Sequence, residues 1–169
     1  MKIMDILWAP WRMRYIEYAS IERPKGCFIC EAVRTDKPDE KLVLYKGKMT
    51  IVLMNLYPYN TGHLLIAPIR HVPSIENLSE KELLALFKAV KSSVESLRRA
   101  LNPHGFNIGI NLGRVAGAGL EEHVHVHIVP RWEGDTNFMP ILANTKVIPE
   151  ALKDTYLKLK RNSHAISEK

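Results

Sequence analysis

The sequence has few cysteines and no long apolar segment, and both absences limit the class of protein. Its apolar runs, such as residues 51–54 and 64–68, are far shorter than the about 18 residues that a membrane-spanning helix needs. The first residues are interrupted by Asp5, Pro10 and Arg12, which argues against a secretory signal peptide. Two cysteines are too few for a framework of disulfides. We therefore expect a cytoplasmic protein without a membrane anchor.

The composition is that of one globular domain. Of the 169 residues, 46% are hydrophobic and 25% are charged, which is close to the average for folded domains. The formal net charge is +6 and the pI is about 9.3, so the surface attracts anions such as phosphate-bearing metabolites, RNA or a membrane. No basic stripe is interleaved with aromatic residues, which argues against a general nucleic-acid-binding protein.

The pattern of apolar residues predicts an α+β fold. Short alternating segments predict strands at 42–45, 49–54, 63–67, 106–111 and 122–129, the first two joined by a hairpin around Gly47. Ser79 and Glu82 form a capping box that begins a long helix, whose expected inward face is Leu83, Phe87, Val90, Val94, Leu97 and Leu101. The helix should end at Asn102-Pro103, with Gly105 permitting the reversal. Pro149 should open a C-terminal helix with Leu152, Tyr156 and Leu159 on one side.

Five short strands with one long inserted helix favour an antiparallel sheet backed by helices over a doubly wound parallel sheet. We expect three parts in the chain. Residues 1–26 form an N-terminal arm, residues 27–145 form the domain, and residues 146–169 form a C-terminal helix and basic tail packed on the same domain.

Three histidines alternate with apolar residues between Glu122 and Val129. On a strand, His123, His125 and His127 would share one face, and the alternating valines would face the core. Same-face residues lie about 6.6 Å apart, so the three rings could form one metal triad or take different roles. The spacing alone leaves both possibilities open.

The loop before these histidines, residues 111–120, is rich in glycine. It lacks the Gly-Lys-Ser/Thr ending of a P-loop and leads into a strand instead of a helix. Its backbone amides could still bind phosphate oxygens, although an ordinary connection would look the same.

Cys27 and Cys30 form a Cys-x-x-Cys pair, a spacing used for zinc or for redox chemistry. Two thiolates do not complete a tetrahedral zinc site. A zinc site would therefore need two further ligands, with histidine as the expected type.

The histidine row, followed by apolar residues, resembles the signature of the histidine-triad superfamily. The similarity extends to residues 55–68 and 130–138, and the segments 7–15 and 146–149 resemble the diadenosine tetraphosphate phosphorylase branch, which is related to the Fhit-like group. The resemblance implies the five-stranded antiparallel sheet of that superfamily, a nucleotide substrate, no organic cofactor and a homodimer formed by extension of the sheet.

The resemblance implies that His125 is the nucleophile of an enzyme that cleaves dinucleoside polyphosphates, with diadenosine tetraphosphate as the expected substrate. The reaction would pass through a nucleotidyl-histidine that water or phosphate resolves. His127 would hold a phosphate or bridging oxygen. The amides near Gly119 and the Asn111 side chain would stabilise the developing charge. Substrate-binding residues would be Asn55 on the ribose, the base-flanking set, and His63 beneath the site. The base-flanking set is Phe28, Ile29 and Leu56, for which plain core packing is the alternative.

The resemblance also implies a closed, structural Cys₂His₂ zinc site, whose ligands would be Cys27, Cys30, His71 and His123. One departure concerns Gly119, because Fhit-like and Hint-like relatives carry a Gln or Ser side chain six residues before the nucleophile. Only a backbone amide or a water could replace that contact, which leaves the substrate preference open.

Three alternative functions remain. A Hint-like nucleoside phosphoramidase would use the same nucleophile on P–N substrates, and a nucleotide-binding sensor would bind without turnover. RNA binding through the basic tail would show a steep dependence on salt. A zinc nucleobase deaminase is disfavoured, because Pro24 is separated from Cys27 and no His-x-Glu accompanies the cysteine pair.

Overall fold

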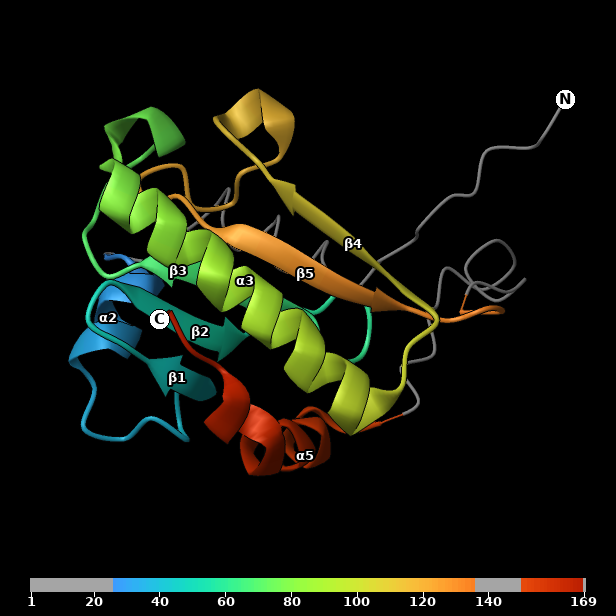
Figure 1. The fold of residues 1–169 in the computed structure, drawn as a ribbon. Helices are drawn as coiled ribbons and strands as arrows, with labels where there is room; N and C mark the ends of the chain where they lie inside the picture. Colours follow the sequence, from blue (N-terminus) through green and yellow to red (C-terminus); the bar gives the residue numbers. More distant parts are fainter. Residues whose placement is uncertain (1–25, 136–149, 169) are drawn as a thin grey trace, which may run out of the picture.

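A computed structural model describes residues 26–135 and 150–168 of the chain (Figure 1). The expected arm 1–26, apart from Gly26, lies outside the described residues. So do Pro149 and the segments 7–15 and 146–149 that carry part of the family resemblance.

Five antiparallel strands form one sheet in the order β1-β2-β3-β5-β4. They are β1 (Val43–Lys46), β2 (Thr50–Met54), β3 (Leu64–Pro68), β4 (Gly105–Ile110) and β5 (Val126–Arg131). The sheet confirms the predicted α+β class. Every residue of β2 and β3 is buried, because helices cover both faces of the sheet at its centre.

The expected strand 122–129 is wrong at its start, since β5 begins at Val126. The pairing of β3 with β5 stops at the pair Ile66 and Val126, and β3 itself ends at Pro68. The Val124 amide therefore donates to the carbonyl of Val72 in the following loop, at 2.8 Å. Two of the three histidines, His123 and His125, thus precede the strand instead of lying on it.

The long helix α3 (Glu80–Leu101) has the predicted capping box at Ser79 and Glu82. Its last residue is followed by Asn102 at φ 46°, in the left-handed region that Asn tolerates better than most residues. The expectation that Gly105 provides the reversal is therefore wrong. Phe87 was also misplaced on the inward face, since it is 54% exposed and Leu86 is fully buried instead.

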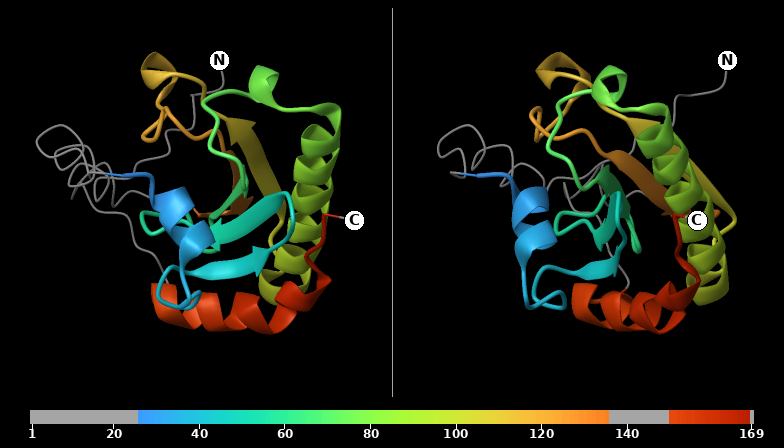
Figure 2. Two further views of the ribbon diagram at one scale, coloured as in Figure 1. Left: turned by 90° about the vertical axis from the view of Figure 1, so that its left-hand side faces the viewer. Right: turned by 60° about the vertical axis from the view of Figure 1, so that its left-hand side comes forward.

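Helices on three sides enclose the sheet (Figure 2). Helix α3 covers one face, the short helix α2 (Phe28–Arg34) covers the other, and α5 (Leu152–Asn162) lies along the β1 edge. The predicted C-terminal helix is confirmed, and its Tyr156 and Leu159 are buried in the core on the α3 side. Helix α2 was not predicted. The remaining helical turns are η1 (Ile75–Asn77), η2 (Arg114–Ala116) and η3 (Ser163–Ala165).

The sheet has one apolar cluster packed on each of its two faces. Val124, Val126 and Ile128 belong to the cluster beneath α3, as the alternation predicted. The cluster beneath α2 includes Ile29 and Leu65. Within the described residues, no helix has the length and apolar character needed to cross a bilayer.

Candidate active site and metal centre

Hydrogen bonds connect the three histidine rings to different partners. The rings of His125 and His127 lie 4.8 Å apart, centroid to centroid. His123 instead contacts the cysteines, with its Nδ1 3.3 Å from the Sγ of Cys27. The three rings therefore do not form one metal triad. Of the two possibilities that the spacing left open, the structure supports the one in which the rings diverge.

The His125 ring is held with one nitrogen fixed as a donor. Its Nδ1–H donates to the backbone carbonyl of His123 at 2.8 Å, so in the neutral ring Nε2 carries the lone pair. Burial lowers the pKa of His125 below its usual value, although the same hydrogen bond opposes the shift. His125 is 5% exposed and lines the main cavity. A neutral imidazole with a defined basic nitrogen is suited to nucleophilic attack.

A chain of hydrogen bonds sets the tautomer of His127. The Tyr59 amide donates to Nδ1 of His63 at 3.1 Å, so the neutral His63 carries its hydrogen on Nε2. That Nε2–H donates to Nδ1 of His127 at 3.0 Å. Nε2 of His127 consequently carries a hydrogen, and the site pairs a basic nitrogen on His125 with a donor on His127.

The two rings lie at a cavity of about 410 Å³ between α2 and the adjacent end of the sheet. Of the predicted site residues, it is lined by Phe28, Asn55, Leu56, Gly119, His125 and His127. Apolar side chains supply most of its other lining, from Ala32, Leu42, Leu53, Met54, Leu65 and Leu120. A mostly apolar cavity with a few polar groups is the usual form of a small-molecule site.

Three of the predicted site residues do not line this cavity. Ile29 is fully buried beneath α2, so its predicted contact with the base is wrong and its alternative, core packing, is right. His63 is also fully buried, which leaves it the supporting role beneath His127. Asn111 lies outside the lining, with its Nδ2 donating to the carbonyl of Gly117 at 3.4 Å, so it braces the loop.

Asn55 lies immediately after β2, where the chain leaves the sheet. Its Oδ1 accepts from the Tyr57 amide at 2.9 Å, and its Nδ2 lies 3.3 Å from Nδ1 of His63. These contacts connect the cavity wall to the hydrogen-bond chain that ends at His127.

The glycine-rich loop passes beside the two histidines. Gly113 and Gly117 have φ values of 77° and 88°, which are accessible to glycine at little cost. Gly117 and Gly119 line the cavity, so their backbones border the space next to His125. Side chains reaching the cavity from Glu40 and Lys41 were missed, because nothing in their local pattern distinguishes them from an ordinary polar turn.

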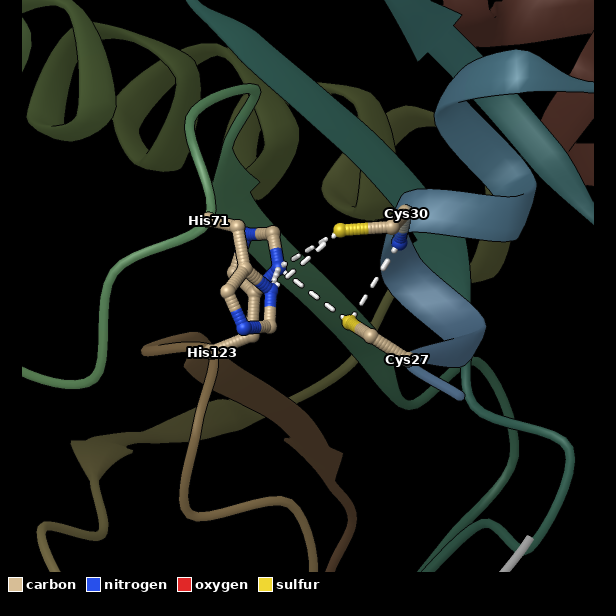
Figure 3. Close-up of side chains that lie close together, drawn as sticks. All are labelled: Cys27, Cys30, His71 and His123. Atoms are coloured by element: carbon tan, nitrogen blue, oxygen red, sulfur yellow. Dashed lines mark hydrogen bonds between the residues drawn. The ribbon is translucent and has the colours of Figure 1, made fainter. Parts of the chain in front are cut away.

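Four side chains from three separate segments converge at the other side of His123 (Figure 3). The ligand atoms of Cys27, Cys30, His71 and His123 all lie within 4.8 Å of one another. Nδ1 of His71 is 3.3 Å from Sγ of Cys30 and 3.2 Å from Nδ1 of His123. Metal bonds of about 2.0–2.3 Å in a tetrahedron place neighbouring ligand atoms about 3.3–3.8 Å apart. The contacts of 3.2–3.5 Å within the cluster are close to this range, so these four residues are suited to hold Zn²⁺.

The surroundings of the cluster also suit a metal. Nε2–H of His123 donates to the Pro68 carbonyl at 2.9 Å, which leaves Nδ1 as the ligand nitrogen. Cys27 caps the N-terminus of α2, with its Sγ accepting from the Cys30 amide at 3.4 Å. Burial, with the neighbouring Cys30 contributing, raises the pKa of Cys27 to about 11. A cation would be needed to hold that thiol as a thiolate.

A model of the HIT domain matches residues 36–134, more than half of the chain. The chain belongs to the HIT family. It is 42% identical over 154 residues to the AP-4-A phosphorylase of Mycobacterium tuberculosis, covering 88% of this chain and 79% of that protein. This match includes residues beyond both ends of the HIT-domain match, since 154 residues exceed the span 36–134.

Solved structures agree with the HIT fold. A histidine triad nucleotide-binding protein from Sulfolobus tokodaii has a TM-score of 0.64 and 28% identity, covering 83% of this chain and 91% of that chain. A zinc-bound histidine triad family protein from Mycobacterium smegmatis has a TM-score of 0.66 at 21% identity, covering 82% and 94%. At that identity, the second likeness bears on the fold alone.

Proposed function

We propose that this HIT protein cleaves dinucleoside polyphosphates, with diadenosine tetraphosphate as the leading substrate, by covalent catalysis at His125. The observation that carries the proposal is the hydrogen bond from His125 Nδ1 to the His123 carbonyl, which leaves a basic Nε2 at the cavity next to the donor on His127. The identity to a phosphorylase named for this substrate supports the choice of substrate.

In the first step, His125 Nε2 attacks the α-phosphorus, a P–N bond forms, and the bond from that phosphorus to the bridging oxygen breaks. The departing polyphosphate takes the bond's electron pair, and the hydrogen on His127 Nε2 stabilises the charge on its oxygen by a hydrogen bond. Backbone amides of the loop at Gly117 and Gly119 would stabilise charge on the phosphoryl oxygens. Water or inorganic phosphate then attacks the phosphorus and releases His125.

The cavity lining supports an assignment of the nucleoside. Phe28 from α2 and Leu56 after β2 both line the cavity and would flank the base. Asn55 would bind the ribose hydroxyls, since it is the polar residue where the apolar end of the cavity meets the histidines. Asn111 would act on the phosphates indirectly, through the loop that it braces.

We further propose that Cys27, Cys30, His71 and His123 hold a structural zinc ion. Four protein ligands leave no open position for a substrate, so the ion would supply cross-linking and no Lewis-acid chemistry. It would join α2, the segment after β3 and the approach to β5.

The chain is also proposed to form a homodimer. Strand β4 is at the edge of the sheet and pairs only with β5 among the described residues. Its Ile108 is 48% exposed. An open, partly apolar edge strand readily pairs with another strand.

Product analysis tests the reaction. Diadenosine tetraphosphate is incubated with the protein in the presence and absence of inorganic phosphate. ADP plus ATP indicates phosphorolysis, and AMP plus ATP indicates hydrolysis. Adenosine phosphoramidate as a parallel substrate tests for a phosphoramidase, and preferential cleavage of it would overturn the proposed substrate class.

The variant His125→Ala tests the nucleophile. We expect its turnover to fall by at least about 10³-fold, with nucleotide affinity within about threefold of wild type. His164→Ala, at an exposed position on η3, is the matched control. Undiminished turnover by His125→Ala would overturn the covalent mechanism, and stoichiometric nucleotide binding without any product from wild type would indicate a sensor.

A further inference from the structure

One wall of the nucleotide cavity is a loop whose shape depends on the C-terminal helix. Residues 38–43, here called the rim loop, contribute Glu40, Lys41 and Leu42 to the cavity lining. Helix α5 lies directly beyond this loop along the β1 edge (Figure 2). It also lies outside residues 36–134, the part that matches the HIT domain model.

The rim loop has an unfavourable backbone conformation at its centre. Leu42 has φ 55°, a left-handed conformation that is uncommon for residues other than glycine. Its amide donates to the Asp39 carbonyl at 3.2 Å, and the Val43 amide donates to the Pro38 carbonyl at 2.9 Å. Such a conformation persists only where surrounding contacts hold it. The Leu42 carbonyl accepts from the Met54 amide of β2 at 3.0 Å, which leaves the Val43 carbonyl to be held from outside the sheet.

Helix α5 provides that fixation. The hydroxyl of Tyr156 lies 2.9 Å from the carbonyl of Val43 and 2.6 Å from Oδ1 of Asp39, so its single hydrogen is shared between these two acceptors. Nζ of Lys160, one turn along α5, also donates to the Val43 carbonyl at 3.0 Å. The two anchored residues, Asp39 and Val43, bracket the three that line the cavity.

The Val43 carbonyl is the buried anchor of the two. Asp39 is 74% exposed, so solvent weakens its interactions, whereas Val43 and Tyr156 are each 3% exposed. Strand β1 is the edge of the sheet, and a buried carbonyl there needs a partner outside the sheet. Burial, aided by Asp39, raises the pKa of Tyr156, so its hydroxyl remains a donor throughout the physiological range.

We propose that Tyr156, supported by Lys160, is a positioning residue for substrate binding. It holds the rim loop in the shape that the nucleoside requires, through the carbonyl of Val43. The C-terminal helix is thereby part of the substrate-binding apparatus, although it contributes no residue to the cavity lining. The substrate named here rests on the proposed function, but the role of Tyr156 in shaping the loop can be measured without turnover.

The test compares Tyr156→Phe with Ser96→Ala. The first removes the hydroxyl and keeps the buried ring. The second removes another hydrogen bond that docks α5, from Ser96 Oγ to the Asn162 carbonyl at 3.0 Å, away from the cavity. We expect Tyr156→Phe to raise the KM for diadenosine tetraphosphate about 3–10-fold with kcat within about twofold, the size of one lost hydrogen bond. Ser96→Ala should leave both parameters unchanged.

Hydrogen–deuterium exchange supplies the readout that does not depend on catalysis. The amides of Leu42 and Val43 should exchange faster in Tyr156→Phe than in Ser96→Ala, at matched thermal stability. Lys160→Met, which keeps the aliphatic stem, should give a smaller change of the same kind, and this variant serves if Tyr156→Phe does not fold.

The outcomes separate the two proposals. If wild type cleaves no dinucleotide, the proposed function fails. In that case, faster exchange at Leu42 and Val43 in Tyr156→Phe, together with weaker binding of AMP by this variant, would still support the role of Tyr156. Equal exchange in Tyr156→Phe and Ser96→Ala would overturn that role. A fall in kcat at constant KM would also overturn it, because positioning of the rim loop acts on binding.

Discussion

At the residue scale, the direction of a few hydrogen bonds gives two similar imidazoles opposite properties. His125 donates through Nδ1 to a carbonyl, whereas His127 accepts at Nδ1 from His63. The first ring therefore presents a lone pair on Nε2 and the second presents a hydrogen. A backbone amide, that of Tyr59, begins the chain that fixes His127 and cannot change its role as donor.

This polarity predicts a role for His127 in the transition state. Charge develops on the bridging oxygen as the polyphosphate departs, and the hydrogen on His127 Nε2 can stabilise that charge. We expect His127→Ala to lower kcat for diadenosine tetraphosphate about 10²–10³-fold, with affinity for AMP within about threefold of wild type. Steady-state kinetics and binding of AMP measure the two quantities. A rise in KM at unchanged kcat would mean that His127 only binds the phosphate.

Residue types and spacing identified the histidine row and the cysteine pair, and the family resemblance added His71 and His123 to that pair. Neither separated Phe28 from Ile29. The two are neighbours on α2, and one lines the cavity while the other is fully buried. A helix of seven residues is too short to show a clear period, and cysteine is not a favoured N-cap. Without the helix, the side that each residue presents to the sheet could not be assigned.

At the scale of elements, long periodic segments were predicted well and their ends were not. Helix α3 begins at the predicted cap, but Asn102 takes the left-handed conformation expected of a glycine. Strand β5 begins only at Val126, because its pairing with β3 ends at the pair Ile66 and Val126 and the residues before Val126 have no partner on β3. Local alternation does not reveal which distant strand will pair with a segment, or how far. Single-strand patterns also gave no indication of which strand would be at the edge.

The C-terminal residues provide an electrostatic prediction at this scale. The Glu168 carboxylate accepts from the amides of Lys48, Met49 and Thr50 in the β1–β2 hairpin and from the Thr50 hydroxyl. Burial alone would raise the pKa of Glu168, but these hydrogen bonds outweigh burial and lower it. Since the folded pKa lies below the ordinary value, the stabilisation is present above about pH 4.5 and is lost as pH falls through the folded pKa.

Glu168→Gln should therefore lower the thermal midpoint at pH 7 by about 2–4 °C, a loss of roughly 1 kcal/mol, and the difference from wild type should shrink below about pH 4. Differential scanning calorimetry from pH 3 to pH 8 measures it. Glu95→Gln, on the exposed side of α3, is the control and should show no such pH dependence. A difference that persists unchanged at pH 3 would contradict the electrostatic explanation.

At the scale of the whole molecule, the metal cluster connects segments that are 93 residues apart in the chain, Cys30 and His123. One ion would join α2 to His123, whose carbonyl also accepts the hydrogen bond of His125, the proposed nucleophile. His123 would thus supply both the ligand Nδ1 and this carbonyl. The division of the chain into an arm, a domain and a tail remains a prediction, since residues 1–25 and 136–149 lie outside the described parts.

His71→Ala should abolish binding of zinc without opening the core, because His71 is the exposed member of the cluster. Metal analysis should fall from one zinc per chain to near zero. A ligand present at about 100 times its Kd stabilises by about 2.7 kcal/mol, so the thermal midpoint should fall by about 5–11 °C. His164→Ala should keep both the zinc and the midpoint. Full zinc content in His71→Ala would show that another residue completes the site.

The edges of the sheet predict where two chains would associate. The β1 edge is covered by α5, whose Tyr156 and Lys160 bind the Val43 carbonyl, whereas β4 at the opposite edge exposes Ile108. Ile108→Glu places a negative charge on each of two paired edges, and like charges that face each other across strands are destabilising. Light scattering after size exclusion should therefore change from the mass of two chains to the mass of one. Leu157→Glu, at a similarly exposed apolar position on α5, should remain dimeric. If Leu157→Glu dissociates and Ile108→Glu does not, association occurs at the α5 side instead of at β4.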